Sequence, residues 1–572
     1  MKRFFHVVFF CMIGLCMVNT GLFIYPSLSQ YFSIVLLSFF SLTSLFFYMF
    51  IKKEKIDLSK TLIIMFLWAV YIVLQTLSIP HGAYYDMYLM LSYFCFFLSV
   101  FESFRLKIIS KNGLMYIFFF WGIIESVICL IQYAGIIGSP SKYFNIAGSL
   151  ENPNVTAMFI TACFPFGIFY FLRRHKYWGI ILNSLLFIAL LLLECRTAYL
   201  GLLIVIVVFL ISNKKIKDII GKLSKKSKII YSVLILAGAL FVGSYLYLHK
   251  KESADGRLFI WKLSAQMITS KPVFGYGYGL FERNYNIYQS NYFKSGYGSE
   301  KERENADHVN MAYNEYIEQW INGGIIGLFF YLSILVLLFW VAVKQKNKEI
   351  ISITAAIVLM GFSNFIVQAI PVWLLFLTYL ASISEQEKKT VASIRKPPVE
   401  ILLVCSVLGI GLIYESAIFF DAQYTLKQAF ELSKEQKMEQ ASQLLKQHVD
   451  KAGASEVYLR NFGKSLIFNK NYSDAILILK KASYYTSNPD VFYSLAFCYI
   501  QNEQYKDAEN ALYTVAYMIP TNLKSRYQLM LLYDSLNQTE QANQMANEIV
   551  NMQPKVITKE GTFYKEAAKL NR

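Results

Sequence analysis

Long apolar runs separated by short polar connections fill the chain up to about residue 420. Many runs hold 17 or more residues with almost no charge, which is enough for one helix to cross a hydrocarbon core of ~30 Å. The pattern predicts an all-α, polytopic membrane helix bundle with about thirteen spans. The first predicted span ends near residue 24, and the others lie at 31–51, 61–79, 84–103, 113–135, 155–172, 178–194, 197–212, 228–248, 323–343, 350–369, 371–384 and 400–420.

After residue 420 the pattern changes to short amphipathic helices with balanced charge. Alanines recur there at spacings of 34, 33 and 34 residues, at Ala441, Ala475, Ala508 and Ala542. A period of about 34 residues is typical of helix-pair repeats that stack into a solenoid. This part of the chain resembles tetratricopeptide repeats, whose concave surface would bind a protein partner. We therefore predict two domains, at 1–421 and 422–572.

Basic residues follow every even-numbered predicted span, and the connections after odd-numbered spans mostly lack them. The positive-inside rule then places the amino terminus in the cytoplasm and the connections after odd-numbered spans outside, together with the repeats. The rule also accounts for the net charge of +17 without a nucleic-acid partner, because the basic residues form short clusters between apolar runs. These clusters lie at 52–60, 105–111, 173–176, 214–228, 344–348 and 388–396.

One long polar connection, at about 249–322, is predicted to lie outside the membrane, and loops of this length are usually functional. Residues 257–270 are predicted to form an amphipathic helix that starts at Arg257. The loop holds nine basic and nine acidic residues, so it has no strong charge of its own. Its many aromatic rings suit stacking on sugars or a membrane-interface belt equally well: Tyr276, Tyr278, Phe281, Tyr285, Tyr288, Tyr292, Phe293 and Tyr297.

Glu194 and Arg196 interrupt an apolar stretch from Ile180 to Ile211 that is too long for a single span. We predict a tight external hairpin at this point. A charge at the membrane edge is costly unless it serves a partner. The planar guanidinium of Arg196 is suited to a lipid-linked phosphate, although the two charges could also be a local turn pair at the interface.

The sequence contains no pattern for a metal or another cofactor. The eight cysteines form no CxxC pair and no Cys/His spacing suited to zinc. No DxD pair is placed to hold a metal-bound nucleotide sugar. The composition, 56% hydrophobic and 17% aromatic, excludes an ordinary soluble enzyme. The residues alone therefore give no sign of a metal or another cofactor.

Four short motifs resemble those of the bacterial O-antigen ligase and O-antigen polymerase superfamily over roughly residues 60–385. They are similar to the family in order, in spacing and in their shared external side. The motifs are Asn152-Pro-Asn154, Cys195-Arg196-Thr197, the block Arg257…Trp261…Pro272…Gly275-Tyr-Gly277, and the block Asn314-Glu315-Tyr316…Gly324…Gly327.

The resemblance implies a metal-independent glycosyltransferase in the bacterial inner membrane. Such enzymes move a glycan from undecaprenyl pyrophosphate, on the external face, to a lipid, to another repeat unit or to a protein hydroxyl. Arg196 and Arg257 would stabilise the leaving pyrophosphate. The same motifs would supply the substrate-binding residues Asn152, Asn154, Trp261, Tyr276, Tyr278, Asn314 and Tyr316.

This sequence departs from the family at the general base. The family's histidine directly precedes the asparagine of the last block, where this chain has Tyr313, and His308 lies six residues before Asn314. We favour His308 as the base, because an imidazole titrates in the required range, and Glu315 is the alternative. A third possibility is that the acceptor hydroxyl needs no protein base and catalysis rests on the two arginines.

Two other functions fit parts of the pattern. A transporter or flippase of lipid-linked glycans would need charges lining a path through the membrane, for which Glu125 is one candidate. A membrane-anchored scaffold would use only the repeats. The few charges at membrane depth and the four ordered motifs favour the transferase.

Overall fold

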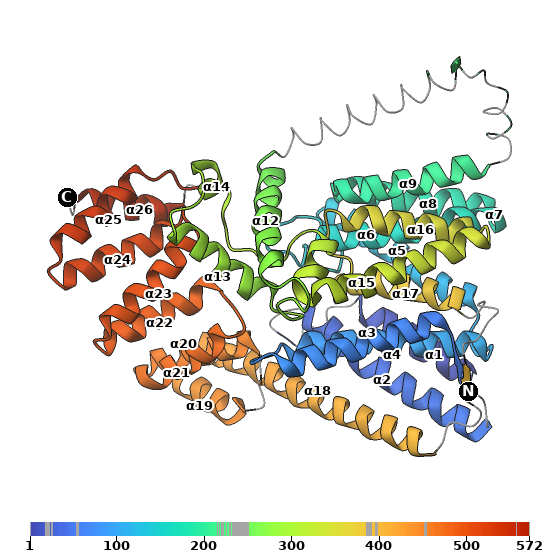
Figure 1. The fold of residues 1–572 in the computed structure, drawn as a ribbon, viewed down its shortest axis with the longest axis horizontal. Helices are drawn as coiled ribbons and strands as arrows, with labels where there is room; N and C mark the ends of the chain where they lie inside the picture. The colour runs from blue at the N-terminus through green and yellow to red at the C-terminus, as the bar shows by residue number, and fades with distance from the viewer. Residues whose placement is uncertain are drawn as a thin grey trace.

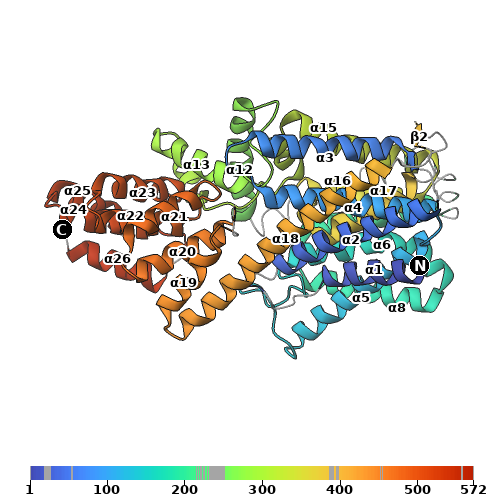
Figure 2. The same cartoon turned by 90° about the horizontal axis from the view of Figure 1, so that it is seen from below.

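The structure is a computed structural model in which an apolar helix bundle is joined to a tail of short helices (Figure 1). It describes residues 2–17, 27–52, 56–213, 251–384, 392–394, 399–450, 455–555 and 558–570, with a few isolated positions between them. In the views of Figures 1 and 2 the tail lies at one end of the bundle, and helices of the long loop lie between the two.

Helices with long apolar faces build the bundle. Capping side chains start several of them: the Ser59 hydroxyl accepts from Leu62 N, and the Asn347 amide oxygen accepts from Ile350 N. The helices are α1 (Lys2–Leu15), α2 (Ser27–Lys52), α3 (Lys60–Ser78), α4 (Tyr84–Arg105), α5 (Lys111–Tyr133), α6 (Pro153–Phe166) with the π-turn η1 (Gly167–Phe171) and α7 (Leu172–Arg174), α8 (Lys176–Leu192), α9 (Arg196–Ser212), α15 (Glu315–Lys344), α16 (Lys348–Gly361) and α17 (Ile370–Ser384).

Six helices in the described part of the chain are long and apolar enough to cross a membrane: Leu28–Met49, Lys60–Ser78, Tyr84–Arg105, Lys111–Tyr133, Pro153–Arg174 and Glu315–Lys344. Helices α8, α9 and α17 are apolar but shorter. The count of about thirteen spans therefore stays a prediction, and its span at 228–248 lies outside the described residues. The span predicted at 350–369 is wrong in extent, because α16 ends at Gly361.

One small sheet departs from the predicted all-α fold. Strand β1 (Ile56–Leu58) pairs antiparallel with β2 (Ala392–Ile394), and Ile56 lies opposite Ile394. The two strands belong to the basic connections that follow α2 and α17. The sequence analysis predicts that both connections lie on the cytoplasmic side, and that placement stays a prediction.

The long loop is a folded unit made of α12 (Lys251–Ser270), α13 (Phe281–Lys294) and α14 (Glu300–Asn305). The predicted amphipathic helix is present as α12, which begins earlier than expected. The aromatic rings have a role that the sequence analysis did not consider. Phe281, Tyr285 and Phe293 are buried and form the unit's own core with Leu263 and Met267.

The tail consists of helix pairs with the predicted repeat length. Its four repeating alanines are all buried in one hydrophobic core, as expected where small residues let two helices approach closely. Assignment to the tetratricopeptide family stays a prediction. The helices are α18 (Val399–Lys434), α19 (Met438–His448), α20 (Glu456–Phe468), α21 (Tyr472–Ser483), α22 (Pro489–Gln501), α23 (Tyr505–Met518), α24 (Leu523–Ser535), α25 (Thr539–Asn551) and α26 (Lys559–Leu570).

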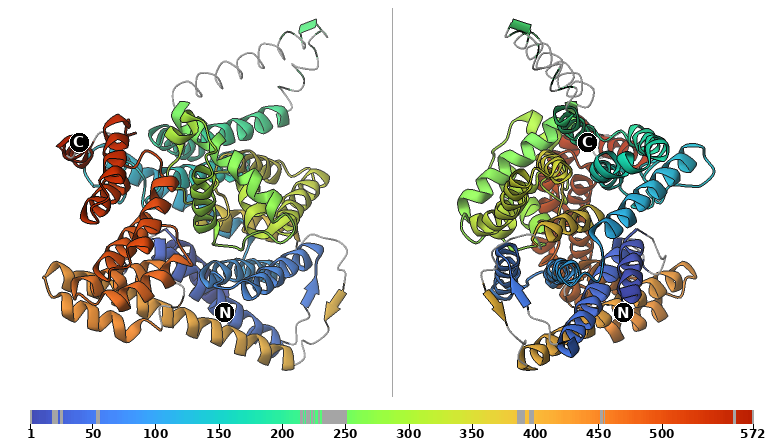
Figure 3. Two further views of the ribbon diagram at one scale, coloured as in Figure 1. Left: turned by 60° about the vertical axis from the view of Figure 1, so that its left-hand side comes forward. Right: turned by 90° about the vertical axis from the view of Figure 1, so that its right-hand side faces the viewer.

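Helix α13 of the loop packs against α23 of the tail (Figures 1 and 3). The Gln289 side chain donates to Met518 O at 2.6 Å, and the Ser290 hydroxyl donates to Thr514 O at 2.9 Å. In the connection between α3 and α4, the His81 ring stacks on Tyr484 with centroids 4.0 Å apart. The loop, this connection and the tail therefore share one end of the bundle.

Candidate active site at the arginine pair

The hairpin before Arg196 is present as predicted. Helix α8 ends at Leu192, and α9 begins at Arg196, so the apolar stretch is two helices. Between them Glu194 adopts a left-handed backbone with φ of 48°, which reverses the chain within a few residues. Arg196 is thus the first residue of α9, where the helix dipole is positive.

Arg257, far away in the sequence, lies beside this hairpin. Burial lowers the pKa of Arg257, Tyr313 and Cys195 raise it, and the charge of Arg196 lowers it by a smaller amount. The Arg257 Nη1 donates to Ser363 O at 2.9 Å, and the next residue, Asn364, donates to Thr197 Oγ1. Arg257 therefore lies near the start of α9, the helix that Arg196 begins.

Helix α12 explains why Arg257 and Trp261 are spaced four residues apart. Residues at this spacing lie on one helix face, and both side chains contact the segment before α15. The Arg257 guanidinium lies over the Tyr313 ring, 5.1 Å from its centroid. The Trp261 Nε1 donates to Ala312 O at 2.9 Å. Trp261 therefore has a structural contact at the position where the sequence suggested a substrate contact.

Asn314 is the cap of α15. Its Oδ1 accepts from the backbone N of Tyr316 at 3.0 Å and of Ile317 at 3.1 Å, and its Nδ2 donates to Phe362 O at 3.1 Å. The Tyr316 hydroxyl donates to Val358 O at 2.8 Å. Asn314 and Tyr316 thus both fasten the start of α15 to the end of α16.

The segment 362–368, between α16 and α17, meets every part of this site, and the sequence analysis missed it. Besides holding Arg257 through Ser363, it contacts α9, because the Asn364 Nδ2 donates to Thr197 Oγ1 at 2.6 Å. Glu315 Oε2 accepts from Ile366 N at 2.5 Å and from Val367 N at 3.1 Å. The signal in the sequence was the polar pair Ser363-Asn364, which follows Phe362 just after the end of α16 in a mostly apolar run.

The two glycine-containing blocks pack on each other. Tyr276 N donates to Ile321 O at 2.7 Å, and Ile325 N donates to Pro272 O at 2.9 Å. Gly324 interrupts α15 with φ of 62°, and a Cβ there would lie 2.0 Å from Val273 O. Only glycine fits such an approach. The blocks therefore close the loop unit onto the bundle.

Tyr276 and Tyr278 belong to the same contact. The Tyr278 side chain is 2% exposed, accepts from Trp68 Nε1 at 3.0 Å and donates to Gln319 Oε1 at 3.1 Å. The Tyr276 hydroxyl pairs with Ser270 Oγ at 2.6 Å. The Tyr278 ring is thus packed inside the protein, whereas the sequence suggested that it stacks on a substrate.

Asn152 and Asn154 start α6 next to α9. The Asn152 Oδ1 accepts from Asn154 N at 3.0 Å, which caps the helix. Thr161 Oγ1 donates to Ala198 O at 3.3 Å and joins the two helices. The turn before α6 is held by Glu125, whose Oε2 accepts from Ser149 N at 2.9 Å. Glu125 therefore supports a loop, in contrast to the transport role considered for it.

His308 lies at the interface with the tail. Its Nε2 is 2.6 Å from Glu282 Oε1. Glu282 also accepts from the Ser487 backbone N at 3.1 Å and from its hydroxyl at 2.7 Å. Arg257 and Asn314 instead contact segment 362–368, at Ser363 O and Phe362 O respectively. The structure thus places His308 in a different set of contacts from the arginines.

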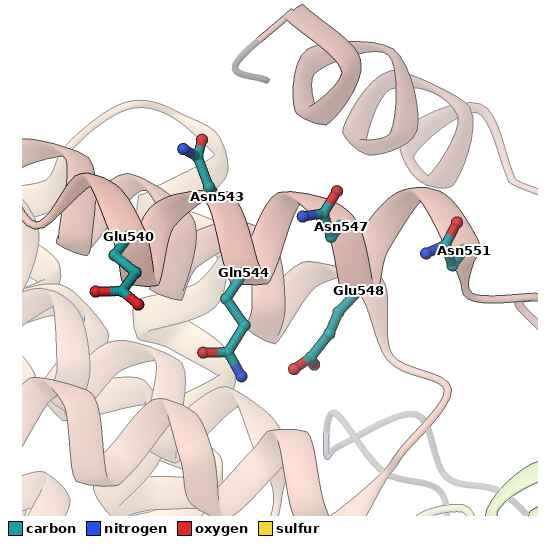
Figure 4. A pocket seen from close by; sticks show the side chains of 6 residues that line it. All are labelled: Glu540, Asn543, Gln544, Asn547, Glu548 and Asn551. Atoms are coloured by element: carbon teal, nitrogen blue, oxygen red, sulfur yellow. The ribbon is translucent and has the colours of Figure 1, made fainter.

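Two features of the described residues concern possible ligands. Among the described residues, no group of three or more His, Cys, Asp or Glu side chains is arranged to hold a metal ion. The tail has a shallow, polar hollow along α25, shown in Figure 4. It is lined by Glu540, Asn543, Gln544, Asn547, Glu548 and Asn551.

Comparison with known proteins agrees with the motif analysis. A family model described as O-antigen ligase matches residues 181–332, which include the hairpin, both arginines and the folded loop. No curated protein matches the chain. The matched region contains most of α8, all of α9 and the first part of α15, one of the six long apolar helices. These findings support the O-antigen ligase family for this chain, and with it a membrane glycan-processing role in surface polysaccharide biosynthesis.

Proposed function

We propose that this protein transfers a glycan from undecaprenyl pyrophosphate to an acceptor hydroxyl, at the end of the bundle where the folded loop lies. The observation that carries the proposal is that segment 362–368 holds Arg257 near the start of α9, which Arg196 begins. Two arginines in one half-buried place favour the binding of a dianion. A pyrophosphate ester has this charge, and guanidinium groups match its oxygens in geometry.

The proposed reaction needs few other groups of the protein. The acceptor oxygen bonds to the anomeric carbon of the glycan, and the bond from that carbon to the pyrophosphate breaks. The electron pair leaves with the pyrophosphate, where Arg196 and Arg257 stabilise the growing negative charge. The Arg257 guanidinium is held before the substrate arrives by its hydrogen bond to Ser363 O. Such preorganisation avoids a reorganisation cost in the transition state.

The contacts of His308 and Glu315 argue against either one as the base. Glu315 is buried, and its two oxygens accept from Gln319, Ile366 and Val367. His308 pairs with Glu282 at the tail. We therefore propose the third possibility raised by the sequence, in which catalysis rests on leaving-group stabilisation. The acceptor proton then passes to solvent or to the departing phosphate.

The remaining parts of the proposal concern location. We place the amino terminus in the cytoplasm, and the folded loop and the tail in the periplasm of a bacterial inner membrane. The acceptor would be a glycan, a lipid or a protein. The tail would hold a protein partner or the acceptor near the site, and the amide-rich hollow on α25 is a suitable surface for hydrogen bonds to either (Figure 4).

The test uses the full-length protein in lipid nanodiscs with an undecaprenyl-pyrophosphate-linked oligosaccharide. Products are scored separately for elongation, for transfer to lipid and for transfer to peptide. Arg196→Ala and Arg257→Ala should abolish transfer, and the corresponding Lys variants should recover little, because the planar fork is lost. Arg303→Ala removes an arginine from the surface of the same loop and should leave transfer unchanged. Wild-type protein without transfer activity, or an active Arg196→Ala variant, would contradict the proposal.

A further inference from the structure

Tyr313 has an unusual backbone conformation at the centre of the arginine site. Its φ is 50°, a left-handed value that bulky residues rarely adopt. The residues on both sides of Tyr313 are held in place. The Ala312 carbonyl oxygen accepts from Trp261 Nε1, and the Ala312 backbone N donates to Glu318 Oε2 at 2.6 Å. Asn314 caps α15. Residues held in such conformations by their surroundings cluster at functional sites, so Tyr313 is a candidate for a role beyond packing.

The ring of Tyr313 packs against Arg257. The Arg257 guanidinium carbon lies 5.1 Å from the centroid of the Tyr313 ring. The Phe365 and Tyr313 rings pack edge-on, with their centroids 6.5 Å apart. These two contacts hold the ring from the side of α12 and from segment 362–368. The phenol oxygen is therefore fixed in position close to Arg257, which is itself close to Arg196.

The hydroxyl of Tyr313 is not used by the fold. Within the described residues it makes no hydrogen bond, and it is not among the fully buried polar atoms that lack a partner. Nearby tyrosines differ, since the hydroxyl of Tyr316 donates to Val358 O and that of Tyr93 donates to Val367 O at 2.9 Å. A tyrosine in a half-buried place usually pairs its hydroxyl, so that of Tyr313 is available for a ligand.

The Tyr313 hydroxyl is a donor rather than a base. Burial raises the pKa of Tyr313, and the charge of Arg257 offsets only part of this rise. The phenol therefore stays protonated at neutral pH. A neutral phenol beside two guanidiniums can donate to an oxygen that carries negative charge, and its position is fixed before the ligand arrives. Donors fixed in this way are effective where charge develops in a transition state.

We propose that the Tyr313 hydroxyl is the third donor of the anion site, and that it donates a hydrogen bond to a pyrophosphate oxygen of the lipid carrier held by Arg196 and Arg257. This inference rests on the proposed function, because it takes the anion to be the carrier's pyrophosphate. Tyr313 forms and breaks no covalent bond. It acts on the oxygen that receives the electron pair when the glycan departs.

The test separates the hydroxyl from the ring. Tyr313→Phe keeps the ring under Arg257 and removes only the donor. It should lower the turnover rate about 10²-fold, the lower end of the loss seen for one donor of an oxyanion site, because two guanidiniums remain. Tyr297→Phe removes a hydroxyl from the exposed surface of the same loop and should transfer at the wild-type rate. Binding of glycan-free undecaprenyl pyrophosphate should weaken less than turnover in Tyr313→Phe, since the donor acts mainly on developing charge.

Each outcome is decisive. Wild-type transfer with an equally active Tyr313→Phe variant would overturn this inference and leave the proposed function standing. Wild-type protein that transfers nothing from the carrier would overturn both. A Tyr313→Phe variant that fails to fold would show that the hydroxyl holds the structure together, which also overturns the inference. Thermal unfolding in nanodiscs identifies that case before activity is measured.

Discussion

The Nε2 of His308 lies 2.6 Å from Oε1 of Glu282, a pair within the folded loop where the loop meets the tail. Glu282 belongs to α13 and also accepts from Ser487 N, in the connection between α21 and α22 of the tail. A histidine that precedes a catalytic-looking block is an obvious candidate for a base. Here its partner and the tail explain its presence without catalysis.

His308→Ala should therefore affect the loop–tail interface more than the chemistry. We expect a turnover loss well below the roughly 10²-fold to 10⁴-fold that removal of a general base produces. Limited proteolysis between the loop and the tail should become faster. Glu282→Gln, which keeps the size of the side chain, should have the same effect. A loss above about 10²-fold in His308→Ala, with the protease pattern unchanged, would restore His308 as the base.

The contact between Asn364 and α9 should affect the turnover rate of glycan transfer. Asn364→Leu removes the 2.6 Å hydrogen bond to Thr197 Oγ1 and leaves that buried hydroxyl without this donor, which costs about 1–3 kcal/mol. Because Thr197 follows Arg196, we expect turnover to fall more than carrier binding. The matched control is Asn183→Leu, which removes a 2.7 Å hydrogen bond to Gly179 O within α8. It should lower the melting temperature and spare turnover, and equal turnover in both variants would refute a positioning role for Asn364.

Gly324 is predicted to be indispensable for folding. Gly324→Ala places a Cβ 2.0 Å from Val273 O and requires a non-glycine residue at φ of 62°. The strain alone costs about 1–3 kcal/mol, and the clash adds to it, so the yield of folded protein should fall sharply. Gly411 in α18 has nothing within 4 Å of its Cβ position, and Gly411→Ala should be neutral or slightly stabilising. Size-exclusion chromatography and thermal unfolding compare the two.

The predicted topology can be tested with reporter fusions. A reporter after Asn213 should be cytoplasmic, and one fused after the last tail helix should be periplasmic. The reason is that α9 runs away from the hairpin, whereas the tail contacts the loop at the hairpin's end of the bundle. If both reporters lie on the same side of the membrane, the number of spans between them is wrong by an odd number.

Local patterns predicted the parts of the site that depend on local geometry. The amphipathic pattern of residues 257–270 indicated a helix that starts at Arg257, and the polar break before Arg196 indicated a hairpin. In each case the signal lies within a few residues, where helix geometry fixes which side chains are neighbours.

Contacts between distant segments could not be predicted in this way. Segment 362–368 is mostly apolar, so it looked like part of a span, and only the fold reveals that its backbone holds Arg257 and Glu315. The aromatic rings of the loop were equally ambiguous, because burial in a core and exposure at an interface use the same residue types. His308 was misleading because its partner Glu282 lies 26 residues away in the sequence, and no local pattern pairs the two residues.

Helix α18 has a mechanical consequence. It runs for 36 residues without a break, from the bundle into the first helix pair of the tail, and the tail is held a second time at α13. A body fastened at two separate points cannot swing about either one. The tail and the folded loop therefore move as one piece with the end of the bundle.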